Sequence, residues 1–338
     1  MPTPPKAVIL GCAGASLSDA ERGFFADADP LGFILFGRNC GAPAQLRALV
    51  GSLRESVGRA DAPVLIDQEG GRVARLRPPD WHEAPAAGRI GALASGDMAA
   101  GREAARINAR LMATELFDAG ITVDCVPVLD VPVEGAHDVI GDRAFCADPE
   151  LVADLGAEVC AGMLAGGVLP VIKHMPGHGR AVADSHHALP LVDEPLEVLR
   201  ATDFAPFARL ADAPWGMTAH IVFSAVDDAP ATQSPRVIAD IIRGEIGFTG
   251  VLASDDIGMD ALAGGPAERA AASLAAGCDV VLHCSGILDE MAAVAAAVGP
   301  LSDAAQGRVA AAEARRPAPE PADLPTLAAR LGELLAAG

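Results

Sequence analysis

The sequence predicts a single-domain (β/α)8 barrel, and three observations support this prediction. Eight short apolar runs alternate with helical segments along the 338 residues of the chain. Most of these runs are continuously apolar rather than alternating, which is typical of parallel strands that are buried on both faces. Eight strand–helix units also suit the length of the chain, since such a barrel takes about 250 residues and tolerates insertions. An open, doubly wound sheet is the alternative fold.

Each predicted strand is a β-rich run bounded by glycine, proline or polar residues. In chain order the runs are Ala7–Cys12, Gly32–Phe36, Pro63–Asp67, Thr122–Val128, Leu169–His174, Trp215–His220, Gly250–Asp255 and Asp279–Cys284.

The first run resembles a short secretory signal, because Lys6 precedes it and Cys12 ends it. A signal has roughly 7–15 apolar residues, however, and Gly11 and Gly14 interrupt this run early. We therefore expect a buried strand. Its glycines lack the G-x-G-x-x-G spacing of a dinucleotide-binding turn, which argues against nucleotide binding. Nowhere does the chain reach the ~20 uninterrupted apolar residues of a membrane span.

Helix signals fill the gaps between the runs. Asp148-Pro149-Glu150 supplies an N-cap, a first-turn proline and an acid for a helix over Leu151–Leu164. Ser234-Pro235 has the same function for a helix over Arg236–Ile246. Gly166 lies where the first of these helices should end.

The C-terminal part of the sequence predicts an appendage to the barrel rather than a second domain. Residues 315–321 are rich in proline, which predicts a stiff, extended connector. Leu324–Leu335 is amphipathic and is expected to form a final helix that packs on the barrel. With no internal repeat, residues 1–338 are expected to form one domain.

Composition excludes several classes of partner. The chain has 45 acidic and 25 Lys or Arg residues, so its surface should repel nucleic acid and anionic lipid. Its seven cysteines include no C-x-x-C pair, which fits neither a disulfide framework nor a zinc ribbon. We therefore expect a cytoplasmic monomer with no nucleic-acid or membrane partner and no cofactor.

Polar residues end five of the predicted strands, and in a (β/α)8 barrel the chemistry lies at the C-terminal ends of the strands. The residues concerned are Asp67-Gln68-Glu69 after the third strand, Asp130 after the fourth, Lys173-His174 at the fifth, His220 at the sixth and Ser254-Asp255-Asp256 at the seventh. Because five such groups should converge on one rim, they predict an active site.

The densest polar stretch has four histidines and an aspartate within fourteen residues, from His174 to His187. A metal site is one interpretation, but no H-E-x-x-H or comparable paired spacing is present. The other interpretation is a catalytic loop in which Asp184 orients His186, two residues further on, and makes it more basic.

Four motifs, in order, resemble those of family 3 glycoside hydrolases. They are Asp-Gln-Glu-Gly-Gly-Arg-Val from Asp67, Lys-His-Met-Pro-Gly-His-Gly from Lys173, Asp-Ser-His from Asp184, and Ser-Asp-Asp-Ile-Gly-Met from Ser254. Within the family, the chain resembles the single-domain β-N-acetylglucosaminidases of bacterial cell-wall recycling. Met175 stands where an aromatic residue is common, and Ile257-Gly258 where Leu-Ser is frequent. Neither departure touches a reacting group.

The resemblance implies a role for each candidate residue. Asp255 would be the nucleophile that forms a covalent glycosyl-enzyme, and His186, paired with Asp184, the general acid/base. The residues that would bind the sugar are Asp67, Arg75, Arg143, Lys173 and His174. From the residues alone Asp255 and Asp256 cannot be told apart, because strand alternation only predicts that they face opposite ways. Asp130 and His220 are expected to support the site.

The expected function is therefore retaining hydrolysis of terminal β-1,4-linked N-acetylglucosamine from peptidoglycan fragments, the muropeptides. A family 3 β-glucosidase, or a phosphorylase that uses phosphate in place of water, is the alternative among enzymes. A catalytically silent sugar-binding protein is the alternative from another class. It is disfavoured because binding alone needs no nucleophile.

Overall fold

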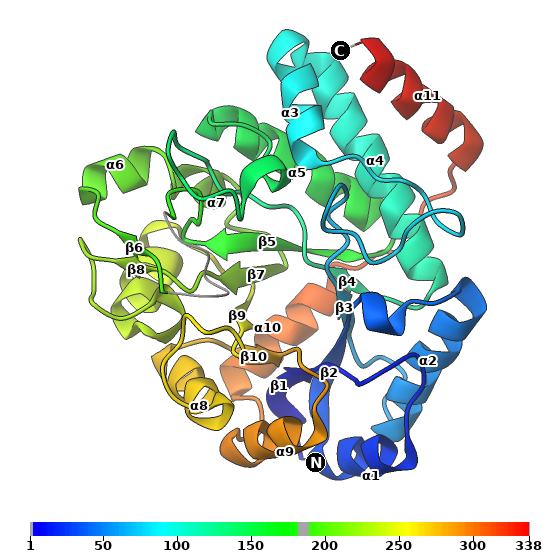
Figure 1. Cartoon of the computed structure of the whole chain (residues 1–338), viewed down its shortest axis with the longest axis vertical. Coiled ribbons are helices and arrows are strands. Elements are labelled where there is room, and N and C mark those ends of the chain that lie inside the picture. The colour runs from blue at the N-terminus through cyan, green and yellow to red at the C-terminus, as the bar shows by residue number, and fades with distance from the viewer. Residues whose placement is uncertain (1–2, 182–188, 338) are drawn as a thin grey trace.

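The computed structural model describes residues 3–181 and 189–337 and confirms the predicted (β/α)8 barrel. Eight parallel strands close in the order β1-β10-β9-β7-β5-β4-β3-β2, with helices around them (Figure 1). The barrel strands are β1 Lys6–Leu10, β2 Pro30–Leu35, β3 Val64–Ile66, β4 Val123–Asp124, β5 Leu169–Met175, β7 Trp215–Thr218, β9 Val251–Asp256 and β10 Val280–His283. Each of these strands overlaps one of the eight predicted runs.

Strand β4 is much shorter than the predicted run Thr122–Val128. Pro127 has no N–H to donate to a neighbouring strand, so it interrupts the ladder. Beyond it, Val128 makes only an isolated bridge to Lys173 of β5. The chain stays bonded to β5 through Pro127 and Leu129 and then reaches Asp130 as a loop.

The helices surround the barrel. Those described are α1 Asp19–Ala28, α2 Pro43–Ser56, α3 Ala87–Gly96, α4 Met98–Asp118, α5 Pro149–Ala165, α6 Leu196–Ala201, α7 Ala205–Arg209, α8 Pro266–Ala276, α9 Leu288–Ala297, α10 Asp303–Ala314 and α11 Leu324–Ala337. Helix α5 begins as predicted, because the Asp148 side chain accepts hydrogen bonds from the backbone N–H groups of Glu150 and Leu151. The helix expected over Arg236–Ile246 is wound as a π-helix over Val237–Glu245.

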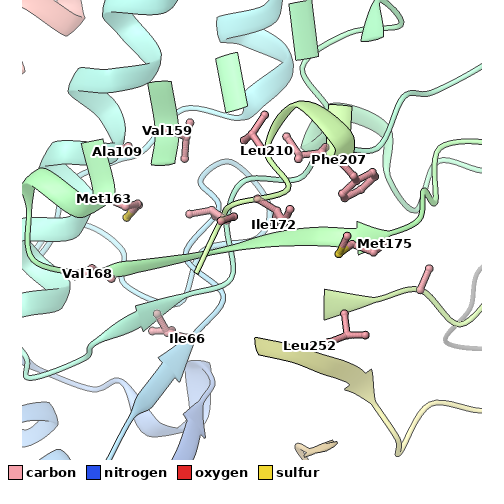
Figure 2. Packing of buried hydrophobic residues seen from close by; sticks show 14 of the residues in the cluster. Ile66, Ala109, Val159, Met163, Val168, Ile172, Met175, Phe207, Leu210 and Leu252 are labelled. Atoms are coloured by element: carbon pink, nitrogen blue, oxygen red, sulfur yellow. The ribbon is translucent and has the colours of Figure 1, made fainter. Parts of the chain in front are cut away.

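The main core lies between the outer face of the barrel and the helices. Ile172 and Met175 on β5 belong to one buried cluster with Val159 and Met163 of α5 and Phe207 of α7 (Figure 2). Burial of these side chains from water is the main force that fixes the helices on the strands. A second cluster, which includes Ile9, Leu65, Val171 and Trp215, fills the barrel interior.

One pair of strands was not predicted, and the packing of the C-terminal helix was predicted only in outline. A pair of two-residue parallel strands, β6 Leu191–Val192 and β8 Val222–Phe223, lies outside the barrel. At the C-terminus, α11 packs on α4, where Arg330 forms an ion pair with Glu103 (Figure 1). Among residues 3–181 and 189–337, no helix is both long enough and apolar enough to cross a membrane.

Candidate active site

A pocket of about 300 Å³ opens at the C-terminal ends of the barrel strands. Both charged and apolar side chains line it. The lining residues are Ile34, Phe36, Asp67, Glu69, Val73, Arg75, Val139, Ile140, Arg143, Lys173, His174, His178, Met217, Asp255, Asp256, Met259, Leu282 and Cys284. Six of the eight residues expected to form the site therefore lie around one cavity.

Four charged side chains form a network of ion pairs on one side of this pocket. Lys173 Nζ lies 2.7 Å from Asp67 Oδ1 and 2.7 Å from Glu69 Oε1. Arg143 donates two parallel hydrogen bonds of 2.8 Å to the Glu69 carboxylate. Glu69 thus bridges two cations. We call Asp67, Glu69, Arg143 and Lys173 the charged wall.

The charges of this wall hold one another in the ionised state. Burial raises the pKa of Glu69, but the Lys173 and Arg143 cations outweigh burial and lower it to about 2. Burial also raises the pKa of Asp67, and Lys173 and Arg75 bring it below its usual value. In turn, burial lowers the pKa of Lys173, whereas Asp67 and Glu69 raise it above the ordinary lysine value. At neutral pH the wall therefore presents fixed carboxylates beside fixed donors.

Arg75 extends the wall toward the pocket mouth. Its Nη2 lies 3.4 Å from Asp67 Oδ2, and its guanidinium stacks 5.3 Å from the Phe36 ring centroid. The turn that carries it is fixed by the buried Gln68, whose Oε1 accepts the backbone N–H groups of Arg75 and Leu76. Arg75 and Arg143 are thus parts of the pocket and not surface ion pairs.

An aspartate–histidine pair lies beside the charged wall. Asp130 Oδ2 is 2.7 Å from His174 Nδ1, and Asp130 Oδ1 accepts the backbone N–H groups of His174 and His178. Burial raises the pKa of Asp130, but His174 lowers it below its usual value. Because an ionised Asp130 accepts from Nδ1, it leaves His174 Nε2 as an acceptor, which lies 3.5 Å from Arg143 Nη2.

Asp255 and Asp256 both line the pocket but differ in their bonding. Asp256 Oδ1 accepts the N–H groups of Gly258 and Cys284, at 2.9 and 3.2 Å, and so ties β9 to β10. Asp255 Oδ1 accepts the Asp256 N–H at 2.8 Å. Burial raises the pKa of Asp255, but His220, His174 and the Asp256 N–H bring it below the usual value, whereas burial raises that of Asp256. Asp255 is therefore the better candidate for an ionised nucleophile.

Glycines in two motifs allow the close packing that shapes the site. Gly70 and Gly71 both have positive φ, and a Cβ at Gly70 would lie 2.3 Å from the Pro85 carbonyl oxygen. Gly179 follows His178, and a Cβ there would lie 2.0 Å from the Val131 carbonyl oxygen. Any side chain at Gly179 would therefore push this segment away from Asp130.

The structure brings together Asp67, Arg75, Arg143, Lys173, His174 and Asp255. Asp184 and His186 fall in the segment 182–188, which lies outside the described residues. Sequence reasoning missed the bridging role of Glu69. Within residues 3–181 and 189–337, no group of three or more His, Cys, Asp or Glu side chains is arranged to hold a metal ion.

This arrangement suits a polyhydroxylated ligand. The charged wall offers fixed donors and acceptors for hydroxyl groups, and a carboxylate lies elsewhere on the same cavity. A carboxylate in that setting can attack an electrophilic carbon of the bound ligand.

Comparison with known proteins gives consistent matches over most of the chain. A family model described as the glycosyl hydrolase family 3 N terminal domain matches residues 10–315. A beta-hexosaminidase of Alkalilimnicola ehrlichii is 41% identical over 282 residues, which cover 82% of this chain and 80% of that protein.

Solved structures of similar chains agree. NagZ from Neisseria gonorrhoeae in complex with N-trifluoroacetyl-D-glucosamine is 34% identical, with a TM-score of 0.79 over 93% of this chain and 98% of that one. The same protein in complex with zinc ion is 32% identical, with a TM-score of 0.86 over 98% of this chain and 99% of that one.

Proposed function

Because this chain belongs to glycosyl hydrolase family 3 and is a glycoside hydrolase, we propose that it is a retaining exo-β-N-acetylglucosaminidase. Its substrate would be a terminal β-1,4-linked N-acetylglucosamine on a peptidoglycan fragment, a muropeptide. Its similarity to a beta-hexosaminidase, and to a protein solved with an N-acylated glucosamine, supports this sugar. The observation that carries the proposal is the placement of Asp255 on the same pocket as the charged wall and across the barrel from Asp67.

This placement orients the sugar. Strands β3 and β9 are four places apart in a closed barrel of eight, so the segments that follow them lie on opposite sides. Asp255 ends β9, and Asp67 follows β3. In a pyranose ring C1 and C4 are also on opposite sides. A sugar with C1 at Asp255 therefore presents its 4-hydroxyl to Asp67, Lys173 and Arg75.

The same geometry supports exo action. The pocket, at about 300 Å³, is at the small end of ligand sites and suits a single sugar residue. The charged wall stands where a further sugar on O4 would have to extend. A chain end is then bound in preference to an internal residue.

The proposed mechanism has two displacements at C1. Asp255 attacks C1 while His186 donates a proton to the departing oxygen, which leaves a glycosyl ester on Asp255. His186 then takes a proton from water, the water oxygen attacks C1, and the ester bond to Asp255 breaks. Asp184 orients the imidazole. As a neutral base, histidine does not repel the carboxylate.

We place this activity in peptidoglycan recycling, and hence in cell-wall biogenesis, cell shape and cell division. The chain would act in the cytoplasm as a monomer, as a single domain over residues 1–338 and without a cofactor. Its net charge of −20 agrees with a partner that is neither nucleic acid nor an anionic membrane surface.

A comparison of substrates and two variants tests the proposal. The wild type is expected to hydrolyse an aryl N-acetyl-β-glucosaminide and to leave the matching β-glucoside almost untouched. Adding phosphate should not change the rate or yield a sugar phosphate. Asp255→Asn should abolish turnover because no group remains to form the ester.

Asp256→Asn is the matched control. Its amide oxygen can still accept from Gly258 and Cys284, so the variant should keep most of the activity. An active Asp255→Asn beside an inactive Asp256→Asn would move the nucleophile by one residue. Preference for the glucoside, or formation of a sugar phosphate, would replace the proposed activity with a different one.

A further inference from the structure

His220 is a buried histidine that lies next to the nucleophile strand but does not line the pocket. It follows β7, which pairs with β9, and its side chain has no exposed surface. Both ring nitrogens have partners. Nδ1 lies 2.7 Å from the hydroxyl of Thr232, and Nε2 lies 3.0 Å from the backbone oxygen of Asp256.

The partners define which nitrogen carries the proton. A carbonyl oxygen can only accept, so His220 Nε2 must donate to Asp256. Burial lowers the pKa of His220, which keeps the ring neutral and leaves Nδ1 as an acceptor. The Thr232 hydroxyl proton is then shared between Nδ1 at 2.7 Å and the Ala219 oxygen at 3.0 Å. The Thr218 hydroxyl, 2.8 Å from that of Thr232, can donate to it in turn.

The chain of bonds ends at the peptide that orients the nucleophile. Asp256 is held on three sides: its N–H donates to the Asp255 carboxylate, its carbonyl accepts from His220, and its side chain accepts from Gly258 and Cys284. The direction of the Asp255 carboxylate therefore depends on a backbone segment that His220 fixes from the neighbouring strand.

We propose that His220, with Thr232 behind it, is a positioning residue that holds the end of β9 so that Asp255 points at the anomeric carbon. This inference rests on the proposed function, in which Asp255 is the nucleophile. Since His220 does not touch the sugar, it contributes to the rate of the chemical step and not to substrate binding. A displacement of about 1 Å at a reacting group can cost on the order of 10²-fold in rate.

The test uses steady-state kinetics on an activated aryl N-acetyl-β-glucosaminide, with the thermal midpoint of each variant measured alongside. His220→Ala should lower kcat on the order of 10²-fold and leave KM within about threefold. Thr232→Val keeps the shape but removes the hydroxyl, and should lower kcat by roughly tenfold at unchanged KM. Thr232→Ser restores the hydroxyl and should recover most of that loss.

Ser234→Ala is the matched control. Ser234 is buried in the same loop, where its hydroxyl donates to Asp227 and accepts the Val237 N–H, and among the described residues it makes no hydrogen bond to β9. The variant should lose stability but keep its kcat. If Thr232→Val behaves like Ser234→Ala, or if KM rises in proportion to the fall in kcat, His220 has only a structural role and the inference is wrong.

Failure of the inference can be told apart from failure of the proposed function. An inactive Asp255→Asn together with a fully active Thr232→Val overturns only the positioning role. If His220→Ala does not fold, the pair Thr232→Val and Thr232→Ser still decides the question.

Discussion

Glu69 holds two cations of the candidate active-site pocket with a single carboxylate. Its side chain is 5% exposed, that of Lys173 2% and that of Arg143 13%. Removing one partner of such a buried group leaves uncompensated charge, which costs far more than breaking a surface pair. The geometry of the charged wall therefore depends on an acid that need not touch the substrate.

Glu69→Gln should destabilise the protein by about 3–5 kcal/mol at pH 7, because Arg143 would lose its paired carboxylate and Lys173 would lose one of its two. Urea unfolding measures this loss. Glu103→Gln, at an exposed ion pair with Arg330, is the control and should change stability little.

Glu69 should also make the stability of the protein depend on pH. Burial raises the pKa of Glu69 and its cations lower it, with a net fall from 4.5 to about 2. A carboxylate with a lowered folded-state pKa stabilises the fold above its unfolded pKa, and this contribution is lost as the pH falls through the folded value. The wild type should thus lose stability between about pH 4.5 and 2, and Glu69→Gln should lose less over that range. Equal losses in both proteins would contradict the assigned role.

Among the elements, the segment that begins at His174 depends on close backbone packing. Gly179 lies against the Val131 carbonyl oxygen, where a Cβ would be 2.0 Å away. Gly179→Ala should displace this segment from Asp130 and lower kcat on the order of 10²-fold.

Gly51 in α2 gives the matched control, because a Cβ there meets nothing within 4 Å. Gly51→Ala should keep full activity and stabilise the helix by up to about 1 kcal/mol. Kinetics and urea unfolding of both variants check the contrast, and a fully active Gly179→Ala would show that the segment tolerates the shift.

The barrel strands could be predicted because each is a continuous apolar run, as buried parallel strands require. The pair β6 and β8 could not, since each strand has two residues and Leu191 is 53% exposed. The π-helical winding of Val237–Glu245 could not be predicted either, because the amphipathic pattern of this segment also fits an ordinary α-helix.

Within the site, the residues that could be predicted from their position lie at the ends of strands, whereas Arg75 and Arg143 lie in the segments that follow and were expected only from the family resemblance. Glu69 was expected on the rim with Asp67, but its bridge between Lys173 and Arg143 could not be predicted, because both partners are distant in the sequence.

The support that Asp124 gives from below the pocket could not be predicted, because it is enclosed in an apolar run and no motif marks it. Its buried carboxyl oxygen accepts the Gln68 N–H, and burial raises the pKa of that carboxyl well above the usual value.

For the molecule as a whole, activity should not depend on a metal ion. The cations beside the proposed sugar site are Lys173, Arg143 and Arg75, and the described residues offer no cluster of metal ligands. Dialysis against EDTA should therefore leave kcat and KM unchanged. Loss of activity that zinc restores would reassign the histidines to metal binding. That readout matters because a similar protein has been solved in complex with zinc ion.

The barrel is closed by strands from opposite ends of the chain, since β1 pairs with β10 and Val8 stands opposite Val281. Bringing such distant segments together costs loop-closure entropy before any contact forms, which slows folding. During synthesis β1 leaves the ribosome first, and its edge that will face β10 stays unpaired until β10 has been made. The segments around the pocket come from β2 to β10, so the pocket is completed only when the barrel closes. A nascent chain that lacks β10 would therefore lack one side of the pocket, and we expect activity to appear only late in synthesis.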